Sequence, residues 1–289
     1  MKTILITGAA GFTGLHACHY FSEAGYRVIG ISRNTAKHLK WELETCDLLN
    51  KFQILNVMKK YKPDYCLHLA GVNSVAQSWD DPLNTIEINV IGTLYLLEAI
   101  RVVKPDCKTL IAGSALSGIN HPYAVSKQIQ QNLSLNWCYL FKLPVIVVKP
   151  CNLIGPGPSS GFVSVLAKRI ALMEKEKKTE SIAISHFDNA REFLDVRDAV
   201  SAYEILLNKG SVNTTYEIGS GQWSLLSDIT AIFQSLTQLD LTFTSTNSFP
   251  DNPPDLMNNE KIKELDWQNF FSLKESIAHT LTYYRTLKD

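Results

Sequence analysis

The sequence predicts an α/β protein built on a doubly wound parallel sheet, with a smaller C-terminal lobe. Apolar runs of strand length alternate with amphipathic segments of helix length through the first half of the chain, and a glycine-rich turn follows the first run. Such alternation is typical of βαβ units, in which helices cover both faces of a parallel sheet. With 289 residues, the chain is long enough to bury the core of such a sheet and to add a second lobe.

Each element is predicted from its own stretch of sequence. The apolar runs that predict strands are residues 4–7, 28–31, 65–69, 109–112 and 145–149. The segments with helical spacing are residues 12–24, 49–61, 84–102 and 123–140. A proline-rich turn farther on introduces two more helices, expected in the second lobe near residues 259–265 and 273–287.

The sequence pattern changes after Lys149. Proline, glycine and serine are frequent in residues 150–161 and interrupt both the strand pattern and the helix pattern. The chain is therefore expected to leave the sheet there. We therefore expect residues 1–150 to form the first domain, to which about 190–220 return, and residues 151–289 to form mainly the second lobe.

The charge balance and composition point to a small-molecule partner. Acidic and basic side chains number 28 each, so no net field would draw the chain to nucleic acid or to an anionic membrane. No apolar run reaches the roughly 18 residues that a membrane-spanning helix needs. Met1 and Lys2 lead directly into the first strand, which leaves no room for a signal peptide, and we therefore expect a cytoplasmic protein.

The six cysteines are scattered and form no Cys-x-x-Cys pair. This spacing favours reduced thiols used as small core residues over disulfides or a metal centre. His16, Cys18 and His19 crowd together on one predicted helix, but no second group of ligands lies near them in the sequence. We therefore expect packing there rather than a zinc site.

A glycine-rich loop, Thr7-Gly8-Ala9-Ala10-Gly11-Phe12-Thr13-Gly14, joins the first strand to the first helix. The first glycine permits a tight turn, the second lets backbone amides approach a pyrophosphate, and the third lets the helix pack against the sheet. The strand before the loop and the helix after it are the context that this motif requires. We therefore expect a Rossmann domain that binds a nicotinamide dinucleotide through Gly8, Gly11, Phe12, Thr13 and Gly14.

The end of the second strand indicates which dinucleotide is bound. Domains that prefer NAD place an acidic residue there to bind the ribose 2′-hydroxyl, whereas this strand ends in Ser32 and Arg33. A guanidinium pairs well with a phosphate dianion, and the serine adds a hydroxyl donor. We therefore predict NADP(H), with NAD(H) as the second choice; a solvated surface arginine is the alternative interpretation.

Asp47 and Leu48 lie where the adenine of such a cofactor would bind. The Asp47 carboxylate is placed to accept a hydrogen bond from the adenine amino group. An aspartate there would be equally ordinary as the N-cap of a helix that starts at Leu48 and Leu49. The sequence leaves these two interpretations of Asp47 open.

A tyrosine and a lysine four residues apart carry the predicted chemistry. Tyr123 and Lys127 lie on a predicted helix, where this separation places both side chains on one face, about 5 to 6 Å apart at Cβ. A free tyrosine titrates near pH 10, and a neighbouring ammonium group would favour the phenolate and lower its pKa. Ser114 can hydrogen-bond a reacting oxygen, and Asn89 can hold a backbone group or a proton-relay water.

These motifs resemble the extended short-chain dehydrogenase/reductases that act on nucleotide sugars, and the resemblance covers nearly all of the chain. The residues that carry it are His68–Gly71, Asn89–Thr93, Ser114, Tyr123, Lys127 and Arg191–Asp198. The resemblance implies that Leu69, Ala70 and Gly71 lie beneath the cofactor. It also implies that Arg191 binds a phosphate of the substrate.

The resemblance leaves reductase, epimerase and dehydratase chemistry open. Dehydratases of the family carry a glutamate soon after the catalytic serine or threonine, whereas Ala115 and Leu116 follow Ser114 here and cannot carry a proton. We therefore disfavour dehydration. A 4-epimerase and a non-catalytic sensor of NADP(H) are the alternatives to a reductase.

Three segments, 72–79, 155–163 and the Arg191 motif, look most like the family members that reduce GDP-4-keto-6-deoxymannose to GDP-rhamnose. This similarity implies substrate contacts by Ser74, Ser78, Asn152, Phe162 and Arg191. The span from Ser114 to Tyr123 is much shorter than the family usually shows, so a loop that lines the pocket has been trimmed.

The resemblance also implies a homodimer. In the family, the helices that correspond to those carrying Asn89 and Tyr123 often pair across a two-fold axis. Helices packed inside one monomer would show the same apolar pattern. The apolar residues expected at the interface are Leu94, Leu96, Leu97, Leu133 and Leu135.

Overall fold

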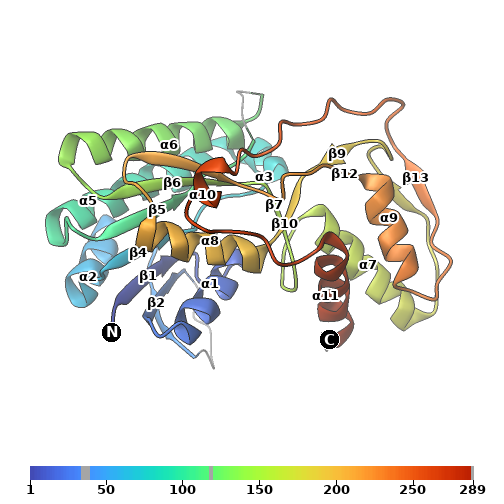
Figure 1. The fold of residues 1–289 in the computed structure, drawn as a ribbon, viewed down its shortest axis with the longest axis horizontal. Coiled ribbons are helices and arrows are strands. Elements are labelled where there is room, and N and C mark those ends of the chain that lie inside the picture. Colours follow the sequence, from blue (N-terminus) through green and yellow to red (C-terminus); the bar gives the residue numbers. More distant parts are fainter. Residues whose placement is uncertain (34–39, 117–119, 288–289) are drawn as a thin grey trace. The chain divides into compact units, whose positions relative to one another are not determined.

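The chain divides into two units in the computed structural model, which describes residues 1–33, 40–116 and 120–287 (Figure 1). Unit 1 contains Met1–Pro150, Val200–Ile218 and Glu260–Trp267. Unit 2 contains Cys151–Ala199, Gly219–Asn259 and the residues from Gln268 onward. The division falls inside helix α8 (Val196–Lys209), whose residues from Val200 onward belong to unit 1.

A parallel sheet forms the centre of unit 1. Among the described residues it has seven strands, in the spatial order β3 (Glu42–Thr45), β2 (Arg27–Ser32), β1 (Thr3–Thr7), β4 (Tyr65–His68), β5 (Lys108–Ala112), β6 (Val145–Pro150) and β11 (Thr214–Ile218). All neighbouring strands are parallel, and the strand order reverses between β1 and β4, which is the doubly wound Rossmann arrangement. The predicted fold class is confirmed, and each of the five predicted strands agrees within one residue at each end.

Helices cover both faces of this sheet (Figure 1). On one face lie α2 (Lys51–Tyr61), α5 (Gly92–Val103) and α6 (Pro122–Phe141), which share apolar clusters with the strands. On the other face lie α1 (Phe12–Glu23) and α8, joined by a hydrogen bond of 2.7 Å from the Tyr20 hydroxyl to Glu204. None of the helices in the described part of the chain is long and apolar enough to cross a membrane.

Several features of unit 1 differ from the prediction, and its strand β11 and its part of α8 were not predicted either. The helix expected at 84–102 is a continuous stretch of α4 (Pro82–Ile86), a π-helical turn (Glu87–Ile91) and α5. The edge strand β3 and the short helix α3 (Val75–Asp80) were not predicted, because neither carries an apolar run. The helix near 259–265 was expected in the second lobe, whereas α10 (Glu260–Lys263) lies in unit 1 against β11.

Two of the five leucines expected at a dimer interface lie in the core of unit 1. Leu96 and Leu97 have no exposed surface, which contradicts their predicted position. Leu133 and Leu135 are partly buried and pack against the same cluster as Leu97. The homodimer itself stays a prediction.

Unit 2 consists of three strand pairs and three longer helices in its described part. The pairs are β7 (Asn152–Ile154) with β10 (Phe193–Asp195), β9 (Ala190–Arg191) with β12 (Ser224–Leu225), and β8 (Ile182–Ile184) with β13 (Phe243–Ser245). The helices are α7 (Phe162–Glu176), α9 (Leu226–Ser235) and α11 (Leu273–Thr286). Their apolar faces form one core with Ile154, Ile182 and Phe193. Of these helices only α11 was predicted, and its position is confirmed.

Candidate active site

The glycine-rich loop turns between β1 and α1 with no room for side chains at two of its glycines. Gly8 has a φ of +72°, and a Cβ there would lie 2.9 Å from the backbone nitrogen of Ala70. A Cβ on Gly14 would lie 2.0 Å from the carbonyl oxygen of Gly8. Gly11 is the N-cap of α1 and supplies no side-chain cap to the amides of the first turn. This cradle fits the pyrophosphate of a dinucleotide, which a helix N-terminus stabilises.

Neighbouring residues hold the loop in place. Phe12 and Thr13 begin α1 and are half-buried. The Thr7 hydroxyl accepts a hydrogen bond of 3.1 Å from the Ala70 amide. It is also 2.7 Å from Nδ1 of His68. These contacts hold residues 69–71, which follow β4, against the loop.

His68 is a neutral histidine inside unit 1. Its Nε2 lies 2.8 Å from the Thr93 hydroxyl, and its Nδ1 contacts Thr7 on the other side. Burial, together with the nearby positive charge of Lys127, lowers the pKa of His68 to about 3. The imidazole therefore bridges β1 and α5 as a hydrogen-bonding group at neutral pH.

The residues predicted to choose the cofactor lie at the carboxyl end of β2. The strand ends at Ser32, and Arg33 follows it with an exposed side chain. The Ser32 carbonyl accepts a hydrogen bond of 2.9 Å from the Cys46 amide, which brings the ends of β2 and β3 together. Residues 34–39 lie outside the described part of the chain.

The interpretation of Asp47 as a helix N-cap is wrong. Helix α2 begins at Lys51, and its N-cap is Asn50, whose side chain accepts hydrogen bonds from two amides of the first turn. The exposed Asp47 carboxylate accepts a hydrogen bond of 3.0 Å from the Leu49 amide instead. Leu48 packs in the core of unit 1. The contact between Asp47 and adenine stays a prediction.

Tyr123 and Ser114 come together beyond the carboxyl end of β5. Both residues are buried. Burial raises the pKa of the Tyr123 phenol, and a hydrogen bond with the Ser114 side chain opposes that rise without cancelling it. The phenol is therefore protonated at neutral pH, as a proton donor must be.

Lys127 lies one turn after Tyr123 on α6. Its surroundings overturn the predicted effect of its charge on the pKa of Tyr123. Its ammonium group donates to the Ala112 carbonyl and to Oε1 of Gln130, both at 2.8 Å. Burial lowers the pKa of Lys127 to about 8. The predicted lowering of the Tyr123 pKa by Lys127 is wrong for this structure, because burial of the phenol dominates and the ammonium group is engaged by two acceptors.

Asn89 lies in the π-helical turn and binds backbone atoms. Its Oδ1 accepts a hydrogen bond of 2.8 Å from the Val72 amide, and its Nδ2 donates to the Val72 carbonyl at 3.0 Å. Nδ2 also donates to the Ser126 hydroxyl at 2.8 Å. A Cβ on Gly71 would lie 2.7 Å from the Asn89 Oδ1. Of the two predicted roles of Asn89, these contacts match the one that holds a backbone group.

The two serines predicted to touch the sugar lie on α3. Ser74 is the N-cap of this helix and accepts a hydrogen bond of 3.2 Å from the Gln77 amide. Ser78 has no exposed surface, and its hydroxyl donates to the Val75 carbonyl at 2.7 Å. This position contradicts the predicted sugar contact of Ser78, because its hydroxyl is turned into its own helix.

The predicted substrate residues of unit 2 lie on separate elements. Asn152 begins β7, and its side-chain amide donates to the Glu192 carbonyl at 2.9 Å. Phe162 begins α7 and packs against the core of unit 2. Arg191 ends β9 and donates to the Ala190 carbonyl at 2.8 Å and to the Asp251 carboxylate at 2.9 Å.

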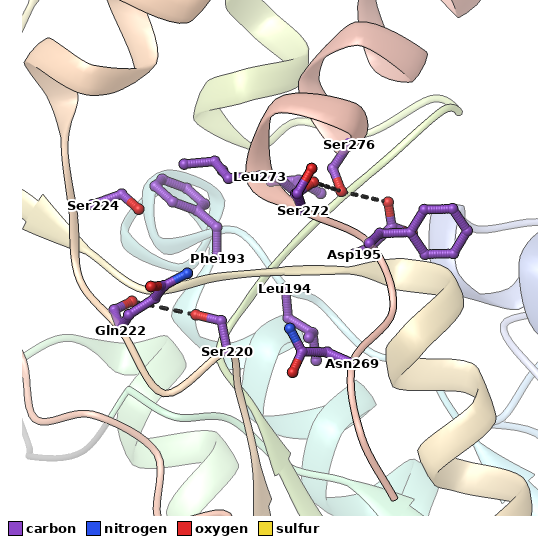
Figure 2. A pocket seen from close by; sticks show the side chains of 12 residues that line it. Phe193, Leu194, Asp195, Ser220, Gln222, Ser224, Asn269, Ser272, Leu273 and Ser276 are labelled. Atoms are coloured by element: carbon purple, nitrogen blue, oxygen red, sulfur yellow. Dashed lines mark hydrogen bonds between the residues drawn. The ribbon is translucent and has the colours of Figure 1, made fainter.

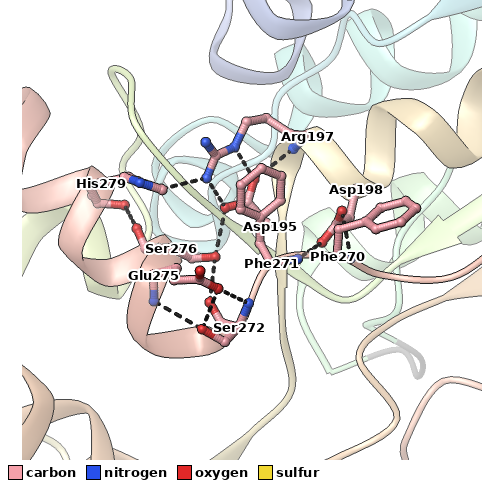
Figure 3. Close-up of polar contacts among 10 residues, drawn as sticks. Asp195, Arg197, Asp198, Phe270, Phe271, Ser272, Glu275, Ser276 and His279 are labelled. Atoms are coloured by element: carbon pink, nitrogen blue, oxygen red, sulfur yellow. Dashed lines mark hydrogen bonds and ion pairs between the residues drawn. The ribbon is translucent and has the colours of Figure 1, made fainter.

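The second part of the Arg191–Asp198 motif anchors the C-terminal helix (Figure 3). Arg197 binds both carboxylate oxygens of Asp195, at 2.8 and 2.7 Å, and its guanidinium carbon lies 3.6 Å from the centre of the Phe271 ring. Asp198 accepts hydrogen bonds of 3.1 Å from the amides of Phe270 and Phe271. These contacts fix the segment that leads into α11, so this part of the motif has a structural role.

A cavity of about 90 Å³ opens beside this anchor (Figure 2). Inside it the Ser276 hydroxyl donates to the Asp195 carboxylate at 2.7 Å. Sites for ligands of drug size are typically about 300 to 1,000 Å³, so this cavity is too small for a nucleotide sugar. Its lining includes Phe193, Asp195, Ser220, Gln222, Ser272 and Ser276.

Comparison with known proteins decides the family. The model of the NAD dependent epimerase/dehydratase family matches residues 4–219. GDP-6-deoxy-D-mannose reductase of Pseudomonas aeruginosa is 31% identical over 262 residues, which cover 83% of this chain and 82% of that protein. The chain belongs to the NAD dependent epimerase/dehydratase family. The resemblance inferred from the sequence motifs is thereby confirmed.

One further relative and one solved structure extend the comparison. A trifunctional UDP-glucose 4,6-dehydratase/UDP-4-keto-6-deoxy-D-glucose 3,5-epimerase/UDP-4-keto-L-rhamnose-reductase of Arabidopsis thaliana is 25% identical, and this chain spans 47% of its length. The structure of RMD from Pseudomonas aeruginosa complexed with NADPH is 26% identical and aligns over 99% of both chains with a TM-score of 0.86. Family members are NAD(P)-dependent oxidoreductases or epimerases that act on nucleotide sugars.

Several supporting residues of this family member were not predicted. Gln130 follows Lys127 by three residues, a helical spacing that could have indicated their contact. The buried Glu192 carboxylate accepts hydrogen bonds from the amides of Gly221, at 2.7 Å, and Met257, at 2.9 Å. These partners are far apart in the sequence, so no local pattern predicts them.

Proposed function

We propose that this protein uses NADP(H) to reduce a nucleotide-linked 4-keto-6-deoxy sugar, with GDP-4-keto-6-deoxymannose as the best candidate and GDP-rhamnose as its product. The observation that carries the proposal is the buried, protonated phenol of Tyr123 beside Ser114. A reductase needs a proton donor in its resting state, which this phenol supplies. The 31% identity to GDP-6-deoxy-D-mannose reductase supports the choice of substrate.

The residues take distinct roles in this reaction. When bound, NADPH supplies the hydride that reduces the C4 carbonyl of the sugar. Tyr123 donates its phenolic proton to the oxygen that becomes the C4 hydroxyl, and Ser114 hydrogen-bonds the same oxygen. Water then returns a proton to the phenolate. In this proposal Lys127 binds the nicotinamide ribose, and Arg191 binds a diphosphate oxygen of the substrate.

An NADPH oxidation assay tests the proposal. Purified protein should oxidise NADPH when GDP-4-keto-6-deoxymannose is added. Tyr123→Phe should lower kcat by at least about 100-fold, since general acid catalysis contributes 10² to 10⁴. Tyr139→Phe, at an exposed position on the same helix, is the matched control and should keep full activity. The absence of turnover with the GDP-, UDP-, CDP- and dTDP-linked ketosugars would refute the proposal.

The proposed preference for NADP(H) depends on Arg33. Arg33→Ala should weaken NADPH binding about tenfold or more and leave NADH binding unchanged, because only NADPH carries the 2′-phosphate that the guanidinium would bind. Arg27→Ala, at the opposite end of β2, is the control. Titrations of both cofactors measure the effect. Equal affinities of the wild type for NADPH and NADH would contradict the assignment.

A 4-epimerase is the second candidate, because the family model covers epimerases. An epimerase restores its cofactor in each cycle, so it would interconvert sugars with no net oxidation of NADPH. A sensor that only binds NADP(H) would show neither activity. Net NADPH oxidation that requires the ketosugar therefore separates the proposed reductase from both alternatives.

A further inference from the structure

Arg191 is held by an acidic residue from the proline-rich segment 250–254. Its Nη2 donates to Oδ2 of Asp251 at 2.9 Å, and its Nη1 donates to the Ala190 carbonyl at 2.8 Å. Arg191 and Asp251 are 60 residues apart in the sequence, and both belong to unit 2. Their side chains are 33% and 49% exposed, so the ion pair lies at the surface of this unit.

Asp251 is itself fixed by a buried residue. Asn189 has no exposed surface. Its Oδ1 accepts a hydrogen bond of 2.6 Å from the Asp251 amide, and its Nδ2 donates to the Asp251 carboxylate at 3.0 Å. The same Nδ2 donates to the Ser185 hydroxyl at 2.8 Å. The carboxylate therefore occupies a set position that is determined by the core of unit 2 as well as by Arg191.

We infer that Asp251 is a positioning residue that orients the Arg191 guanidinium for the diphosphate of a nucleoside diphosphate. A guanidinium has five N–H donors, and the contacts with Ala190 and Asp251 use two of them. The remaining donors can bind an oxyanion while the first two keep the group in one orientation, which reduces the entropy lost on binding. The inference rests on the proposed binding of a substrate phosphate by Arg191.

A competing role of Asp251 would change the affinity for the diphosphate in the opposite direction. A carboxylate that merely competes with the ligand for Arg191 would weaken diphosphate binding, so its removal would tighten it. The clamp from Asn189 favours positioning, because a competitor needs no second anchor on both its backbone and its side chain.

Calorimetric titration of the full-length protein with GDP, in saturating NADP⁺ and fixed salt, tests the inference. Asp251→Ala should weaken GDP binding about three- to tenfold, which lies in the lower part of the range expected for residues in direct contact. Asp251→Asn keeps an acceptor oxygen, so it should weaken GDP binding less than Asp251→Ala does. Asp255→Ala removes the same charge from an exposed position four residues away and should bind GDP like the wild type. In an Arg191→Ala background, Asp251→Ala should have no further effect.

The inference is overturned if Asp251→Ala binds GDP as tightly as the wild type or more tightly. It is also overturned if Asp255→Ala lowers the affinity for GDP as much as Asp251→Ala does. It is also overturned if the loss persists in the Arg191→Ala background, or if the wild type binds none of GDP, UDP, CDP and dTDP. Failure of the proposed function has a different result. In that case the coupling between Arg191 and Asp251 is present in the GDP titrations, but no ketosugar supports NADPH oxidation.

Discussion

Burial shifts the pKa values of three ionisable side chains around the candidate catalytic site. Tyr123 stays a neutral phenol, and His68 stays a neutral imidazole with a pKa of about 3. The pKa of Lys127 falls to about 8. The helical spacing predicted that Tyr123 and Lys127 share a face. It could not predict the contact of Lys127 with the Ala112 carbonyl, because Ala112 reaches it only through the packing of β5 against α6.

His68 predicts a pH dependence of stability. Its pKa is about 3 in the folded protein and 6.5 in an ordinary histidine, so between these values only the unfolded chain binds the proton. The free energy of unfolding should therefore fall as pH drops through this window. His68→Gln removes this titration, and urea unfolding at pH 7 and pH 4.5 should show a smaller loss of stability than in the wild type.

The control for this measurement is His19→Gln, since the His19 side chain on α1 is 53% exposed. This variant should lose stability with falling pH as the wild type does. An equal loss in His68→Gln and the wild type would show that His68 does not contribute to the acid sensitivity.

Elements buried on both faces were predictable, and elements that depend on distant contacts were not. Strands β1, β4, β5 and β6 are nearly continuous apolar runs because helices cover both sides of the sheet. The edge strand β3 is only half-buried and shows no such run. The π-helical turn at Asn89 is fixed by contacts with Val72 and Ser126, which no helical periodicity encodes.

One added methyl group where the glycine-rich loop meets α1 should strongly affect stability and NADPH binding. In Gly14→Ala the added Cβ would lie 2.0 Å from the Gly8 carbonyl oxygen, so the helix and the loop must separate. We expect this overpacking to lower the free energy of unfolding by about 1 to 3 kcal/mol and to weaken NADPH binding. Denaturant unfolding and NADPH titration measure the two effects.

Gly161→Ala is the matched control for this substitution. Gly161 is also next to the start of a helix, and its nearest contact for an added Cβ is the Ser159 hydroxyl oxygen at 3.4 Å, an ordinary van der Waals distance. Gly161 is the N-cap of α7, where alanine is less favourable than glycine, so this variant should lose at most about 1 kcal/mol and should keep its NADPH affinity. If Gly14→Ala is as stable as Gly161→Ala, the close approach at the loop does not constrain residue 14.

For the whole molecule, the family follows from motifs spread along the chain, whereas the reaction does not. The predicted cofactor and proton-transfer residues fall in unit 1, and the predicted phosphate contact Arg191 falls in unit 2. The local motifs predicted each of these roles from a few residues. They could not decide between a reductase and an epimerase, because both use the same tyrosine and the same cofactor loop. That choice depends on whether hydride leaves the cofactor in a net reaction.

Isotope transfer tests this choice most directly. The protein would be incubated with GDP-4-keto-6-deoxymannose and NADPH that carries deuterium at its transferable position, and the sugar product would be analysed by NMR and mass spectrometry. The proposed reductase should place deuterium at C4 and form NADP⁺ in equal amount to the product. A product without deuterium at C4, or a product formed without NADP⁺, would contradict the proposed function.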